Sequence, residues 1–303
     1  MIVLGIAATV LIVLLLLWNR KKARLHPLHM TPHYPIVGAS FHLEIDGHKF
    51  FKQMRRYAEE SNFLFVIWFF MYPTVWIGQV KFAEFVLRSN EVITKSFLYD
   101  PMHPWLGTGL LTSTHQKWKS RRRAVTPSFH FSILNDFQKI FAKQAQVFAS
   151  KLKTYSEKGE AFNIQIPVGL VTLDIICETA MGVSVNAQGQ KDSEYVKAIA
   201  VSNLELQNRM KYPWLWPDFI YYRTSYGKLF QEKLKILHGF TTDVINEKIS
   251  ARNDSKNLPN NTGGKAFMYM LLELYEKGEI DIEGIREEAV SYTHLTLPTI
   301  CSV

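Results

Sequence analysis

The chain has 303 residues, of which 47% are hydrophobic and 20% are charged. This is enough apolar material for the core of one large domain or of two small ones. The same composition excludes a disordered or fibrous protein. Lysine and arginine outnumber aspartate and glutamate by 35 to 27, and the resulting charge of +8 suits nucleic acid, an anionic membrane surface or an acidic protein partner. The cysteines, Cys177 and Cys301, are too few for a disulfide framework or a structural zinc site, which indicates a reducing, cytosol-facing environment.

Residues 1–18 are predicted to form an uncleaved transmembrane signal anchor. Ile2 to Trp18 is an almost unbroken apolar run, and as a helix it would span ~26 Å, close to the core of an endoplasmic reticulum bilayer. The alternative, a cleaved secretory signal, would carry its positive charge before the run. Here the cations follow it, which places the amino terminus in the lumen and the remaining chain in the cytosol. These cations are Arg20, Lys21, Lys22 and Arg24.

The next segments predict a hinge, a helix and a hairpin. Residues 19–40 are basic and contain Pro27, Pro32 and Pro35, so they are expected to form a stiff spacer. His48–Glu60 has apolar residues on one side of a helix. The aromatic and β-branched runs at 63–70 and 74–80 predict a β-hairpin.

The remaining chain reads as mostly helical, which gives a fold class of mainly α with a small β-sheet. Four further helices are predicted, the second and third of them from apolar periodicity, and the third is expected to end at Gly182. Their predicted bounds are Gln116–Arg123, Phe137–Tyr155, Val168–Met181 and Ser225–Ser250.

Trp118 and Arg122 are the candidate binding residues. They lie four residues apart, so on a helix their side chains project from one face. An indole N–H beside a rigid guanidinium suits a pair of carboxylates. A core tryptophan beside a solvated cation is the structural alternative.

The stretch from Leu106 to Phe131, LGTGLLTSTHQKWKSRRRAVTPSFHF, resembles the helix of cytochromes P450 whose Trp-x-x-x-Arg contacts the haem propionates, and its flanks resemble family four in its microsomal, insect-like branch. Leu170 to Gln188 and Arg209 to Thr224 are similar to other segments of that family. DIEGIREEAV, Asp281 to Val290, resembles the start of its long central helix.

The resemblance implies a cytochrome P450 fold, with residues 41–290 as the amino-terminal half of the domain. It implies that Trp118 and Arg122 bind haem propionates, and that the parent protein is a haem-thiolate monooxygenase. Such an enzyme inserts one oxygen atom from O2 into a fatty acid, hormone or xenobiotic, with electrons from an NADPH-dependent reductase. It would sit in the endoplasmic reticulum membrane, in contact with membrane lipid.

Phe97, Leu110 and Leu111 lie where the family's first substrate-contacting loop would be, and their apolar character fits a lipophilic substrate. Ordinary packing is the alternative role for these three residues. The sequence offers no candidate for a catalytic residue or for a metal ligand.

The sequence departs from the family pattern after Ala289, so the fold is expected to be truncated before the central helix and the haem-binding loop. The axial cysteine ligand is absent from this chain, because Cys301 lacks the glycine and arginine context of the haem loop. Residues 291–303 are rich in Thr, contain Pro298 and are poorly suited to extend a helix, so we interpret them as a non-native tail. The chain as written is therefore expected to be inactive.

Two alternatives from other classes remain open. A haem-free, membrane-tethered interaction fragment is one. A nucleic-acid binder is the other, prompted by a basic cluster on one predicted helix. The predicted anchor argues against nucleic acid as a partner, and we expect Lys119 and Arg123 to face the cytosol and attract the reductase while Arg122 turns inward. The cluster consists of Lys117, Lys119, Arg121, Arg122 and Arg123.

Overall fold

The computed structural model describes residues 2–44, 46–129, 131–159, 161–190, 193–255 and 267–296. The chain divides into two units, residues 1–93 and residues 94–303. Each unit has its own buried cores.

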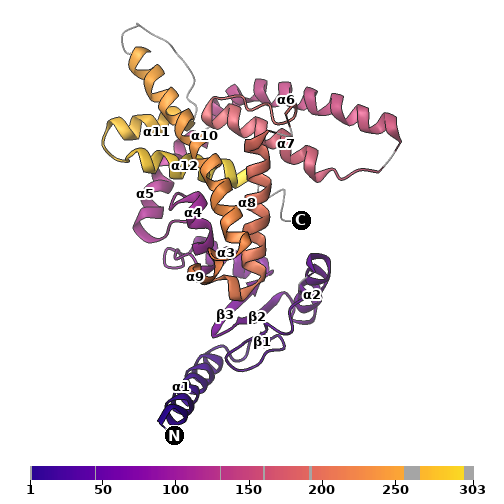
Figure 1. The fold of residues 1–303 in the computed structure, drawn as a ribbon, viewed down its shortest axis with the longest axis vertical. Coiled ribbons are helices and arrows are strands. Elements are labelled where there is room, and N and C mark those ends of the chain that lie inside the picture. The colour runs from indigo at the N-terminus through magenta and orange to yellow at the C-terminus, as the bar shows by residue number, and fades with distance from the viewer. Residues whose placement is uncertain are drawn as a thin grey trace. The chain divides into compact units, whose positions relative to one another are not determined.

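The described residues of the first unit form three helices and three strands, in the order α1 (Ile2–Arg24), β1 (His29–Met30), α2 (Gly47–Glu60), β2 (Leu64–Phe69), β3 (Tyr72–Ile77) and α3 (Val80–Arg88) (Figure 1). The predicted helix after the hinge and the predicted hairpin are both confirmed. The Asp46 side chain caps α2 by accepting a hydrogen bond from the Lys49 amide at 2.9 Å.

The strands form a three-stranded sheet in which β2 is central, parallel to β1 and antiparallel to β3. Alternate residues of β2 point to opposite faces. Phe65 and Ile67 pack with α2, whereas Val66 and Trp68 pack with Trp18 of α1. Burial on both faces explains why this strand is apolar throughout instead of alternating.

The predicted anchor, residues 1–18, is helical within α1 wherever the structure describes it. Across the described residues, no helix has both the length and the apolar character needed to cross a membrane. The anchor therefore stays a prediction.

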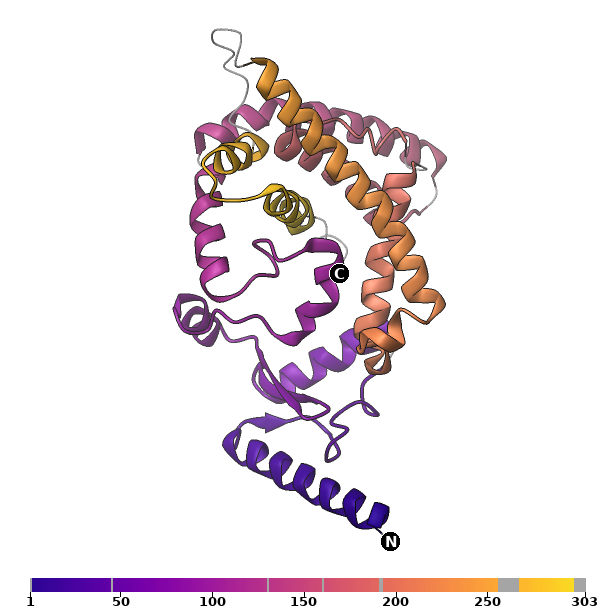
Figure 2. The same ribbon diagram turned by 60° about the vertical axis from the view of Figure 1, so that its left-hand side comes forward.

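The second unit is helical (Figure 2). The helices α8 and α10 lie side by side, and α12 packs against α10 and α11. The helical elements are η1 (Phe97–Met102), α4 (His103–Leu106), α5 (His115–Val125), η2 (Thr126–Phe129), α6 (Phe131–Lys158), α7 (Gln165–Ile176), η3 (Cys177–Met181), α8 (Glu194–Lys211), η4 (Pro213–Leu215), α9 (Asp218–Tyr221), α10 (Ser225–Ser255), α11 (Phe267–Glu276) and α12 (Ile282–Thr296).

One buried cluster joins α7, η3, α8, α10, α11 and α12. The end of the third predicted helix differs from a regular α-helix, because Cys177–Met181 forms a π-turn before Gly182. Gly182 then adopts φ 66°, a left-handed conformation that glycine tolerates and that ends the helix as predicted.

The expectation that residues after Val290 are poorly suited to extend a helix is wrong for the described part. α12 continues to Thr296, and Ser291 and Tyr292 are both buried. The Tyr292 ring stacks on Phe267 of α11 with centroids 4.1 Å apart. Tertiary burial thus outweighs the weak intrinsic helix preference of Ser and Thr. Cys301 and Pro298 lie outside the described residues.

Candidate functional site

The helix α5 presents Trp118 and Arg122 one turn apart, as the sequence predicts. Trp118 is partly buried and packs against the main hydrophobic core, which fixes the indole. Arg122 is exposed, and its guanidinium has no hydrogen bond or ion pair to any side chain that the structure describes. One anchored donor and one unpaired cation on the same face suit an anionic group with two carboxylates.

The expectation that Arg122 turns inward is wrong. Arg121 turns inward instead: its side chain is 13% exposed, and its Nε lies 3.5 Å from Oε1 of Glu288. Tertiary packing explains why Arg121 is the buried one, because the buried carboxylate of Glu288 on α12 faces that side of α5.

Glu287 and Glu288 of α12, named the carboxylate latch hereafter, join three segments. Oε1 of Glu287 accepts hydrogen bonds from the Thr108 amide at 2.8 Å and from the Thr108 hydroxyl at 2.7 Å. Its Oε2 accepts from Nζ of Lys117 at 2.8 Å. Glu288 accepts from the Leu110 amide at 3.1 Å. The latch therefore ties the loop after α4 and the start of α5 to α12.

Glycine lets the loop approach α12 this closely. A Cβ on Gly109 would lie 2.5 Å from the backbone oxygen of Glu287 and 2.4 Å from Oγ of Ser291. Gly107 has φ 61°, in the left-handed region that favours glycine. The loop conformation and the latch consequently depend on both glycines.

The two latch carboxylates differ electrostatically. Burial raises the pKa of Glu288 to about 7, an effect that the Leu110 amide and the Arg121 charge only partly offset. Burial also acts to raise the pKa of Glu287, but the hydrogen bonds from Lys117 and Thr108 outweigh it and leave that pKa lowered. Glu287 is therefore the charged anchor of the latch, and Glu288 is the member that takes up a proton near neutral pH.

The three predicted substrate residues occupy different surroundings. Phe97 is partly exposed in η1 and meets the ring of Trp216 edge-on, with centroids 5.4 Å apart. Leu110 is only 8% exposed and belongs to the main core. Leu111 is partly buried against the same core. The structure thus brings Leu110 and Leu111 together and shows each predicted residue in a packing contact.

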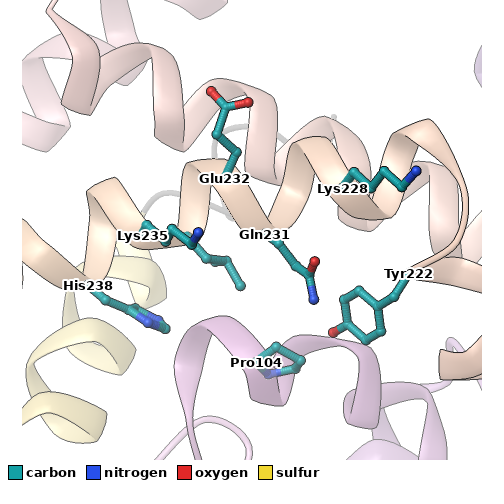
Figure 3. A pocket seen from close by; sticks show the side chains of 8 residues that line it. Pro104, Tyr222, Lys228, Gln231, Glu232, Lys235 and His238 are labelled. Atoms are coloured by element: carbon teal, nitrogen blue, oxygen red, sulfur yellow. The ribbon is translucent and has the colours of Figure 1, made fainter.

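A surface pocket of about 470 Å³ lies between α4 and α10 (Figure 3). His238 borders it, with Nε2 3.3 Å from the carbonyl oxygen of Trp105. Burial and the nearby Arg286 charge lower the pKa of His238. None of the predicted site residues lines this pocket. Its lining residues are Pro104, Tyr222, Lys228, Gln231, Glu232, Leu234, Lys235 and His238.

Two further polar residues hold the helices in place. Asp174 is buried and accepts hydrogen bonds from the amides of Ala187 and Gln188 at 2.5 and 2.9 Å. Arg209 is 2% exposed and donates to the carbonyl oxygens of Leu215 and Trp216. Both side chains therefore form hydrogen bonds with the backbone of segments that connect helices.

Sequence reasoning missed the latch. A signal was present, because Glu288 falls on the same helical face as the apolar residues Ile285, Ala289 and Tyr292, where a carboxylate is unusual. Which cation each of the two buried carboxylates meets depends on contacts more than 160 residues apart in sequence, such as Lys117 with Glu287. Periodicity alone does not encode that pairing.

The family model for cytochrome P450 matches residues 28–297. The chain belongs to the cytochrome P450 family. Cytochrome P450 4V2 of Rattus norvegicus is 38% identical over 292 residues, which is 92% of this chain and 55% of that protein. The human protein of the same name is 38% identical over 91% of this chain and 55% of its own length. Cytochrome P450 4c3 of Drosophila melanogaster is 38% identical over 78% of this chain and 46% of its own length.

The chain spans about half the length of the curated relatives it matches. The resemblance to family four and the mainly α fold with a small β-sheet are confirmed. The family match extends to residue 297, seven residues beyond the boundary predicted at 290.

Cytochromes P450 carry haem, and the residues of α5 fit its propionates. The half-buried indole of Trp118 and the unpaired guanidinium of Arg122 are donors of the right kind. Cys177 does not fit the role of an iron ligand, because its side chain is fully buried and burial raises its pKa far above the usual range of a thiol. Within the described residues no group of three His, Cys, Asp or Glu side chains could hold a metal ion.

Proposed function

We propose that the protein represented by this chain is a haem-thiolate monooxygenase acting on a lipophilic substrate such as a fatty acid, a hormone or a xenobiotic. The reaction would insert one atom of O2 into a C–H bond and release the other as water, with two electrons from NADPH delivered by a reductase. The single observation that carries this proposal is that Trp118 lies on one face of α5 with Arg122, which is exposed and has no side-chain partner among the described residues, in a chain of the cytochrome P450 family.

The bound haem would supply oxygen activation, and the residues of this chain would hold it. Trp118 would donate its indole N–H to one propionate, and Arg122 would bind the other through its guanidinium. Because Lys117 and Arg121 bind Glu287 and Glu288, the latch fixes both the position and the rotation of α5. The latch residues are thus positioning residues for the propionate contacts.

Phe97, Leu110 and Leu111 are proposed to supply the apolar contacts with substrate. Phe97 and Leu111 are partly exposed, and Leu110 is buried beside Leu111. Exposed Lys119 and Arg123 on α5 would attract an acidic surface of the reductase.

The latch also weakens the nucleic-acid alternative, because two cations of the basic cluster are already paired with carboxylates. The apolar run at 2–18 and the cations that follow it support a single amino-terminal anchor in the endoplasmic reticulum membrane, with the rest of the chain facing the cytosol.

The test compares Arg122→Gln with Arg123→Gln in the full-length enzyme supplied with its reductase. Each charge-assisted hydrogen bond contributes ~1.5–3 kcal/mol when well shielded. Because Arg122 is exposed, we expect a smaller loss, about tenfold in haem affinity, from Arg122→Gln. Arg123→Gln should retain normal haem content and a normal reduced, carbon monoxide-treated spectrum. Equal effects of the two variants would contradict the propionate role.

Substrate class is tested separately by supplying medium-chain fatty acids to the same preparation. Failure to oxidise them, with haem content intact, would contradict lipid hydroxylation without affecting the haem assignment. Complete failure to bind haem would instead favour the haem-free, membrane-tethered interaction fragment.

A further inference from the structure

A cationic cleft of about 520 Å³ lies within the first unit, between the carboxyl-terminal end of α1, the segment around β1, and α2. Lys22, His29, His33 and Arg56 line it, together with the single carboxylate Glu60. Residues 25–28 connect the end of α1 to β1 (Figure 1). The cleft therefore lies just beyond the end of the apolar helix.

Its neutral polar groups are already engaged within the protein. The amide and hydroxyl of Thr31 both donate to the carbonyl oxygen of Val66, at 3.0 and 3.2 Å. Nδ1 of His33 lies 2.5 Å from the carbonyl oxygen of Thr31 and must carry the proton, because a carbonyl oxygen only accepts. Apart from Glu60, the polar groups left to meet a ligand are therefore Lys22, Arg56 and the His29 ring.

The two permanent cations are held at the cleft without strong neutralisation. Nζ of Lys22 lies 4.8 Å from the centroid of the Trp18 ring, which is itself buried in a core. Nε of Arg56 lies 3.9 Å from Oε1 of Glu60, and both side chains are more than half exposed, so their attraction is weak. The first acidic residue of the chain is Glu44. The cleft thus favours an anion.

The surface of α1 next to the cleft is apolar. Leu15, which is partly buried, and Leu11, which is 50% exposed, lie seven and eleven residues before Lys22 on the same face of the helix, about 10.5 and 16.5 Å along its axis. A ligand that fills the cleft with an anionic group can lay a hydrocarbon chain along these side chains. A free anion would leave that apolar surface uncovered.

We propose that this cleft binds the phosphate head group of an anionic phospholipid. Lys22 and Arg56 contact the phosphate, His29 borders it, and the acyl chains run along the exposed apolar side of α1. This assignment does not depend on the proposed monooxygenase activity, since the first unit contains neither Trp118 nor Arg122.

The experiment places the full chain in phosphatidylcholine nanodiscs and measures the association of spin-labelled phosphatidic acid relative to spin-labelled phosphatidylcholine, from the motionally restricted fraction. The double variant Lys22→Gln/Arg56→Gln is expected to lower this relative association at least tenfold, because each cation near an anionic lipid contributes about a fivefold factor. The matched control is Lys52→Gln/Arg55→Gln, which removes the same charge from exposed positions of α2 outside the cleft.

The control is expected to stay within about twofold of the unaltered chain, since these side chains contribute only general surface charge. The exchanged variant Lys22→Arg/Arg56→Lys should retain the selectivity, which separates charge from a folding defect. Three results would overturn the proposal: no selectivity for phosphatidic acid, an equal loss in the control, or displacement of the lipid by a millimolar excess of inorganic phosphate. The last would identify a free phosphate site.

Discussion

Replacing Glu287 by alanine is expected to destabilise the second unit by about 3–4 kcal/mol, because the change removes three hydrogen bonds to one buried carboxylate. The two bonds from Thr108 dominate this loss, since they are charge-assisted and shielded. The Lys117 bond contributes less, under about 1 kcal/mol, because the lysine side chain is 42% exposed and solvent screens its charge. A whole domain has a net stability of only ~5–15 kcal/mol, so the expected loss is a large fraction of it.

The measurement is chemical denaturation of the chain in mild detergent, followed by circular dichroism, with amide hydrogen exchange at Thr108 as a local probe. Glu287→Gln keeps an acceptor oxygen and should cost about half as much as Glu287→Ala. The matched control is Glu283→Ala on the same helix, whose side chain is 52% exposed and should cost less than about 0.5 kcal/mol.

Two results would refute this reasoning. If Glu287→Ala were no worse than Glu283→Ala, the latch would carry no stability. If Lys117→Met cost as much as Glu287→Ala, the ion pair and not the loop hydrogen bonds would dominate.

Three other outcomes follow from the same contacts. Because burial raises the pKa of Glu288 to about 7 from 4.5, its contribution to stability, on the order of 3 kcal/mol, should be full below about pH 4.5 and lost as the pH rises through 7. Glu288→Gln should flatten the free energy of unfolding between about pH 5 and 8, and an unchanged slope would contradict this. Cys177 should resist alkylation until the chain unfolds, measured in the Cys301→Ser variant so that only Cys177 can react; fast labelling of the folded chain would contradict this. Arg209→Met should lower the free energy of unfolding by about 3 kcal/mol, because it removes the hydrogen bonds to two backbone carbonyl oxygens. Asp218→Asn, at a side chain that is 74% exposed, should lower it by under about 1 kcal/mol, and equal losses would show that the ion pair matters more than the backbone contacts.

Local patterns predicted most of the secondary structure. The hairpin of β2 and β3 was predicted because aromatic and β-branched residues on both sides of a short turn have few other stable arrangements. The helices predicted at Gln116–Arg123 and Ser225–Ser250 correspond to α5 and α10, whose ends lie within five residues of the expected positions. The failure at residues 291–296 arose because local preference was weighed without the partner helix that buries Ser291 and Tyr292.

The candidate site was likewise determined partly by the sequence and partly by the tertiary structure. The spacing of Trp118 and Arg122 on one helix face follows from the period of the helix, so the sequence by itself determined it. It also determined the family resemblance, the apolar run followed by cations, and the surplus of positive charge. These properties are local or additive, and no distant contact changes them.

Only the tertiary structure decided which basic residue of α5 is buried. Arg121, Arg122 and Arg123 are chemically equivalent in the sequence, and the buried Glu288 of α12 selects the first of them. The structure likewise joined Thr108 to Glu287 and placed Arg56 across a cleft from Lys22. Each of these arrangements depends on how elements distant in the chain pack together. That packing determines how deeply a charge is buried and so how strongly it interacts, and no spacing in the sequence specifies it.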